Sequence, residues 1–201
     1  MQTFAQDLKA QIAANRLGLK QGDLTNPTVM AQNLNWLYHL MVASENLLCV
    51  AANCSYGHGD PLHLYFLEHL QEERGHAEWL RADMQSADIQ VGGIPREIML
   101  AVGVQYYLVY HVNPAALLGY MLALEAFPTP MAQIELLEAV HGKKLLRTIR
   151  HHAEHDIAHS GALMAVIDSR PTHERPAIQE AATQAMHFII MALHSSEHQN
   201  G

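Results

Sequence analysis

The stretch Ile149–Ser160, IRHHAEHDIAHS, carries four of the 15 histidines in the chain. It contains neither proline nor glycine, and apolar residues recur at helical spacing before and after it. A helix over Lys143–Asp168 is therefore expected. At about 100° per residue, His152, Asp156 and His159 share the apolar face of that helix. Side chains of the kind that bind metals or carry protons are thus predicted to point into the protein.

The same helical periodicity continues through the rest of the 201 residues. Proline and glycine fall between the periodic stretches, and no segment alternates with the period of two that is typical of strands. The further expected helices are Phe4–Asn15, Thr28–Ala52, Pro61–Ser86, Pro95–His111, Pro114–Ala126, Pro130–Val140 and Arg175–His194. The connections are short, and no repeat or low-complexity linker divides the chain. A single all-α domain over residues 1–201 is expected.

Composition excludes several classes of protein. Apolar residues make up 49% of the chain, which is too many for a disordered or fibrous protein. A formal charge of −8 makes nucleic acid an unexpected partner. No apolar run is long enough to span a bilayer, and the N-terminus does not resemble a signal peptide. Cys49 and Cys54 are poorly placed to form a disulfide, so we expect a cytoplasmic protein with reduced thiols.

The expected helix Pro61–Ser86 places an acidic residue on its apolar face. Glu73 falls in the middle of an apolar sector about 80° wide, and His69 and His76 lie at the edge of that sector. The sector consists of Leu62, Phe66, Leu70, Ala77, Leu80 and Met84. A carboxylate in this position is costly unless positive charge meets it.

Two other helices repeat this arrangement. Glu125 projects from the apolar face of Pro114–Ala126, and Glu45 lies on the apolar face of Thr28–Ala52. Glu125 is interpreted together with Glu73 as part of one inward group. Glu45 has an alternative reading as the partner of a buried tyrosine or histidine.

A divalent metal would neutralise several inward carboxylates at once. The nearby basic residues flank the apolar face instead of joining it; they are Lys143, Lys144, Arg147 and Arg150. Glu73 and His76 form the Glu-x-x-His pair that helical bundles use in carboxylate-bridged dimetal sites. Carboxylate and imidazole without thiolate favour iron or manganese over structural zinc. For His152, Asp156 and His159 alone, a hydrogen-bonded core network is the alternative.

The order of these residues resembles the heme-oxygenase-like diiron oxidases and oxygenases, relatives in fold of the TenA thiaminases and of pyrroloquinoline-quinone synthase. In that family three core helices supply, in order, a Glu with a His, a lone Glu, and a His or an acid followed by an Asp and a His. The corresponding stretches here are QEERGHAEW at 71–79, GYMLALEAF at 119–127 and IRHHAEHDIAHS. The resemblance implies a heme-oxygenase-like (TenA-like) bundle of about seven or eight helices.

The resemblance also implies a function. The implied protein is a non-heme diiron enzyme that activates O2 to oxidise a small organic molecule. Manganese is the alternative metal. The implied metal ligands are Glu73, His76, Glu125, His152, Asp156 and His159. Among them, Glu73, Glu125 and Asp156 are the implied catalytic residues. His155 is the alternative to His159.

Two other functions are compatible with the same residues. One is a metal-independent enzyme like TenA or pyrroloquinoline-quinone synthase, and the other is a helical protein that binds a metal or ligand without turnover. A thiaminase would require a cysteine nucleophile near the inward carboxylates, where the pattern places neither Cys49 nor Cys54. The apolar C-terminal helix is expected to form either a homodimer surface or part of the core, through Met186, Phe188, Ile189, Ile190 and Leu193.

Overall fold

The computed structural model describes residues 2–17, 22–57 and 61–198, and within these ranges the side chains of residues 156–158 and 192–198 lie outside the description. The helices are α1 (Phe4–Arg16), α2 (Pro27–Ser55), α3 (Leu62–Glu73), α4 (His76–Gln85), α5 (Arg96–His111), a 3₁₀ turn (Pro114–Ala116), α6 (Leu117–Glu125), α7 (Met131–His141), α8 (Arg147–Ser169) and α9 (Arg175–His198). The prediction of an all-α protein is confirmed, because the described residues contain no strand.

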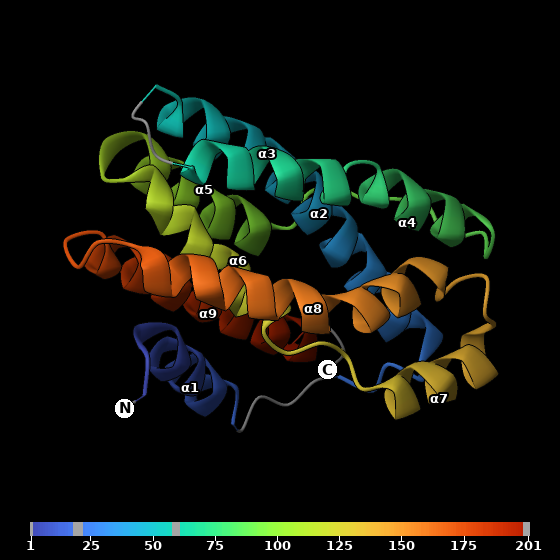
Figure 1. Cartoon of the computed structure of the whole chain (residues 1–201). Coiled ribbons are helices and arrows are strands. Elements are labelled where there is room, and N and C mark those ends of the chain that lie inside the picture. The colour runs from blue at the N-terminus through green and yellow to red at the C-terminus, as the bar shows by residue number, and fades with distance from the viewer. Residues whose placement is uncertain (1, 18–21, 58–60, 199–201) are drawn as a thin grey trace.

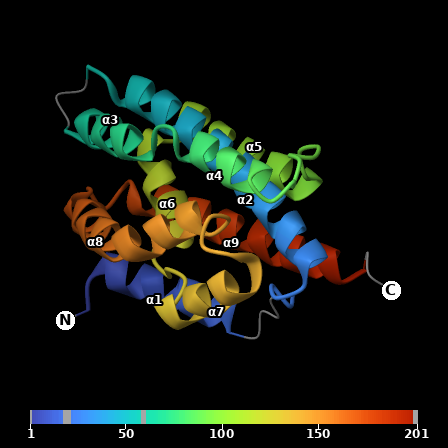
Figure 2. The ribbon, with the colours of Figure 1, turned by 90° about the vertical axis from the view of Figure 1, so that its right-hand side faces the viewer.

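The helix α6 lies at the centre of the bundle. Figure 1 shows α6 between the layer of α2, α3, α4 and α5 and the layer of α8 and α9, and Figure 2 shows α1 and α7 beyond α8. Each residue of Leu117–Ala123 in α6 is buried. A segment that is apolar on all sides is stable only when neighbours cover it completely. The described helices include none that is long and apolar enough to cross a membrane.

The C-terminal helix α9 supplies part of the core, which is one of the two roles expected for it from the sequence. Met186 is 1% exposed, and Ile189 and Ile190 pack against the buried cluster around α6. The side chain of Leu193 lies outside the described residues.

One expected helix is interrupted in its middle, so the prediction of a continuous helix there is wrong. Pro61–Ser86 is divided into α3 and α4, because Arg74 is extended and Gly75 adopts a φ of 92°. A glycine takes such a left-handed conformation without the steric cost that other residues bear. The division raises the number of α-helices above the seven or eight expected. The remaining helices match their predicted bounds to within four residues at each end.

A buried aspartate sets the position of α8 against α4. Asp83 of α4 is 2% exposed, and its Oδ2 accepts hydrogen bonds from the Thr148 amide at 2.9 Å and the Thr148 hydroxyl at 2.6 Å. Its Oδ1 forms an ion pair with Arg147 at 2.8 Å. The carboxylate thereby satisfies a free amide at the start of α8, as an N-capping side chain does. Because His76 precedes Asp83 on α4 and His152 follows Thr148 by one turn, this contact aligns the two histidines.

Gly119 of α6 permits a close approach between α6 and α9. A Cβ atom added to Gly119 would lie 1.8 Å from the carbonyl oxygen of Ile178. We expect Gly119→Ala to lower the free energy of unfolding by about 1–3 kcal/mol, because backbone must shift to admit the methyl group. Thermal and urea unfolding measure the loss. Gly103→Ala is the matched control, since a Cβ there meets nothing within 4 Å, and an equal loss in both variants would contradict the packing argument.

Candidate metal centre

The break between α3 and α4 lies inside the predicted Glu-x-x-His pair. Glu73 ends α3 and His76 begins α4, so the two side chains leave from different helices. The amide of Gly75 donates a hydrogen bond to Glu45 Oε1 at 3.2 Å. Glu45 of α2 therefore holds the turn that joins the two helices, in place of the tyrosine or histidine contact considered above.

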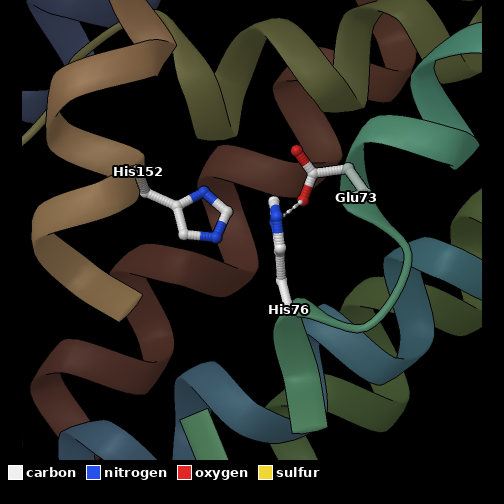
Figure 3. A group of neighbouring side chains, drawn as sticks. All are labelled: Glu73, His76 and His152. Carbon is white, nitrogen blue, oxygen red and sulfur yellow. Dashed lines mark hydrogen bonds and ion pairs between the residues drawn. The ribbon is translucent and has the colours of Figure 1, made fainter. Parts of the chain in front are cut away.

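Glu73, His76 and His152 converge at this break, as Figure 3 shows. The Nδ1 atom of His76 lies 3.1 Å from Glu73 Oε2, and one ligand atom from each of the three residues lies within 4.8 Å of the others. The imidazole rings of His76 and His152 meet edge to face, with centroids 4.8 Å apart. His76 is buried, and the side chain of Glu73 is 17% exposed.

A second group surrounds His69, which sequence reasoning left out of the site. The Nε2 atom of this buried histidine lies 3.2 Å from Glu125 Oε1 and 4.0 Å from Glu73 Oε1. His69 is thus placed between the two inward carboxylates. The signal was present in the sequence, because His69 precedes Glu73 by four residues on α3 and lies at the edge of the same apolar face.

The charges of this group depend on one another. Burial disfavours ionisation of Glu73, but the hydrogen bond with His76 and the nearby His152 and His69 outweigh it and lower the pKa of Glu73. Burial likewise disfavours a charged His69, but Glu125 and, more weakly, Glu73 outweigh it and raise the pKa of His69. Carboxylate and imidazole groups here favour each other's charged forms in a region that water does not fully solvate.

The other predicted ligands lie on α8. The ring of His159 contacts His69, with centroids 5.8 Å apart, and its Nδ1 atom is buried without a hydrogen bond to the described residues. His155 is exposed, and its Nδ1 atom lies 2.8 Å from the His151 carbonyl oxygen of its own helix. The side chain of Asp156 lies outside the described residues, although its backbone belongs to α8 between His152 and His159.

The donor atoms fit a first-row divalent metal. Two imidazoles and one carboxylate form the ligand set typical of non-heme Fe(II) sites with open positions. Bonds to such a metal are about 2.0–2.2 Å long, so two ligands on opposite sides of one ion lie about 4 Å apart. The separations of up to 4.8 Å among Glu73, His76 and His152 require only small side-chain movements to reach that geometry.

A cavity of about 840 Å³ opens beside these residues. Glu73, Glu125, His69 and His152 form part of its wall, and an apolar face of α2 forms much of the remainder. The hydroxyl of the buried Tyr120, another lining residue, lies 2.9 Å from Ser44 Oγ. The volume is within the range of about 300–1,000 Å³ that is usual for small-molecule sites.

Comparison with known proteins identifies the fold. No family model and no curated protein matches the sequence. A domain of unknown function with a heme oxygenase-like fold from Shewanella denitrificans is similar over 96% of this chain and 91% of its own, with a TM-score of 0.79 and 13% identity. A TenA homolog from Pseudomonas syringae pv. tomato is similar over 95% and 91%, with a TM-score of 0.73 and 13% identity. The chain therefore has the heme-oxygenase-like, TenA-like fold predicted from its ligand order.

The contact between Glu45 and Gly75 generates a prediction. Glu45→Ala removes the acceptor of the Gly75 amide, so we expect the free energy of unfolding to fall by about 1–2 kcal/mol. Iron affinity should fall about tenfold, a size typical for loss of a group that orients ligands. Chemical unfolding and Fe(II) titration measure the two effects.

Glu45→Gln is the conservative control for that variant. Its amide oxygen can still accept from Gly75, so both properties should return close to those of the unaltered protein. Loss of iron affinity in Glu45→Gln equal to that in Glu45→Ala would show that the charge of Glu45, not its hydrogen bond, is what the site requires.

Proposed function

We propose that this protein is a non-heme diiron enzyme that activates O2 to oxidise a small organic molecule. The observation that carries the proposal is the convergence of Glu73, His76 and His152 within 4.8 Å, beside a second carboxylate and a cavity. Heme-oxygenase-like folds are compatible with this chemistry, and the donor set is the chemical argument for iron.

Glu73, His76 and His152 would hold a first metal. Glu125 and His159 are the proposed ligands of the second, with Asp156, and His69 lies close enough to join them. Glu73 faces both groups, since its two oxygens contact His76 and approach His69. Its carboxylate would therefore serve both groups of ligands.

Iron bound in this position would supply the electrons that reduce O2. The chain itself contributes by fixing the ligands on separate helices and by surrounding the reacting atoms with apolar walls that limit the access of water. His69 places its Nε2 atom 3.2 Å from Glu125 Oε1, where a proton on that nitrogen can be shared with the carboxylate. Tyr120 and Ser44 present a hydrogen-bonded pair of hydroxyls to the same cavity.

Anaerobic titration with Fe(II), followed by exposure to O2, tests the proposal. We expect about two iron ions per chain and, on exposure to O2, a change in visible absorbance. Glu73→Gln should weaken iron binding by at least tenfold, because it removes a charged ligand from the centre of the site. Glu68→Gln, which makes the same change at an exposed position of α3, should bind as the unaltered protein does.

The other results would assign a different function. Stable iron binding without a response to O2 would favour a storage or binding protein. Absence of iron binding would favour a metal-independent enzyme, and unchanged iron stoichiometry in Glu73→Gln would overturn the assigned ligands.

A further inference from the structure

Two histidines on the outer side of α8, His151 and His155, lie one turn apart and are called the outer pair below. Their imidazole rings stack, with centroids 4.1 Å apart and an interplanar angle of 28°. At about 100° per residue, the outer pair projects roughly 60–100° away from His152, which faces the candidate centre. His155 is exposed and His151 is partly exposed, so solvent reaches both rings. In the part of the chain that the structure describes, neither belongs to the group of Glu73, His76 and His152.

The ring of His155 already has the hydrogen bond that a metal-binding histidine commonly has. Its Nδ1 atom lies 2.8 Å from the carbonyl oxygen of His151. Because a carbonyl oxygen only accepts, the neutral ring carries its proton on Nδ1 and its lone pair on Nε2. Histidines that bind metals usually donate their second ring nitrogen in this way, which fixes the tautomer and the direction of the ring. Among the described residues, neither ring of the outer pair forms another hydrogen bond or an ion pair.

The spacing of the outer pair suits a single ion. First-row divalent ions bind imidazole nitrogen at about 2.0–2.1 Å, so two nitrogens on one ion lie about 3–4 Å apart. Rings whose centroids are 4.1 Å apart reach that spacing through small side-chain rotations. Two histidines four residues apart on one helix face bind zinc in the His-Glu-x-x-His motif, so the spacing is sufficient for joint ligation.

The charged neighbours of the outer pair are balanced by partners of their own. Arg147, one turn before His151, forms an ion pair with Asp83 at 2.8 Å. Arg150 lies 3.2 Å from Glu154 Oε1 and also pairs with Glu138. The positive charge of both arginines is thus compensated, and it does not repel a cation strongly from the two imidazoles.

We propose that the outer pair is a second metal site, in which His151 and His155 bind one first-row divalent cation and water fills the other positions. Two imidazoles without a carboxylate follow the general order of affinity, in which nickel, copper and zinc exceed iron and manganese. The outer site therefore differs in its preferred metal from the centre around Glu73, which offers a carboxylate. The inference does not depend on the proposed function, because it requires neither iron nor O2.

Calorimetric titration with Ni(II) tests this inference. The titration compares Glu73→Gln, in which binding at the centre is weakened, with the same protein that carries His155→Gln in addition. We expect the second substitution to weaken Ni(II) binding at one site by at least tenfold. Loss of a group that only orients a ligand already costs about 10–100-fold, and loss of a ligand should cost no less.

Trp79 provides a second readout, which also locates the ion. Its ring centroid lies 5.5 Å from that of His151, and Ni(II) quenches the fluorescence of an indole so close to it. Ni(II) should therefore quench Trp79 in Glu73→Gln, and the quenching should be lost when His155→Gln is added.

His173→Gln is the matched control, also introduced into Glu73→Gln. His173 is exposed on the connection between α8 and α9 and has no second histidine three or four residues away. This variant should change the Ni(II) affinity less than twofold and leave the quenching intact. A thermal melt of each variant checks that it is folded.

Three results would overturn the inference. They are Ni(II) binding that His155→Gln leaves unchanged, an equal loss in His173→Gln, and no Ni(II) binding to Glu73→Gln. Failure of the proposed function gives a different result. Ni(II) binding that depends on His155, in a protein that binds no iron, would refute the diiron proposal and leave the outer site standing.

Discussion

Two carboxylates that face the interior, Glu73 and Glu125, impose the constraint on which the rest of this structure depends. Neither can remain ionised there without positive charge nearby. The buried His69 supplies it in part, at 3.2 Å from Glu125 and 4.0 Å from Glu73. Two carboxylates and several imidazoles thus face one another in a small, partly buried region, where a divalent cation would neutralise the acids and accept the ring nitrogens as ligands. The metal centre that we propose follows from this arrangement.

Contacts outside the centre hold its residues in place. Glu45 fixes the turn at Gly75 that separates Glu73 from His76, and Asp83 holds the first turn of α8 so that His152 faces His76. These contacts join α2, α4 and α8 to the same small region. Several separate segments therefore contribute to one site. The residues of a catalytic site need such supporting contacts to hold them in a fixed geometry.

Helical periodicity was sufficient to predict the all-α fold, because it depends only on which residues are apolar and where proline and glycine interrupt them. The same periodicity predicted a continuous helix through Gly75, since the left-handed turn there is held by a hydrogen bond from the Gly75 amide to the distant Glu45. It placed His69 at the edge of an apolar face, and its position between two carboxylates became clear only when α3 and α6 were seen together. The cavity arises from the packing of several helices and has no counterpart in any single stretch of sequence.

A crystal structure of the protein loaded anaerobically with Fe(II), with anomalous scattering recorded at the iron edge, tests the central claim most directly. We expect an anomalous peak about 2.0–2.3 Å from a carboxylate oxygen of Glu73 and from one ring nitrogen each of His76 and His152, and a second peak near Glu125. Iron located elsewhere, or no peak among these three residues at saturating Fe(II), would contradict it.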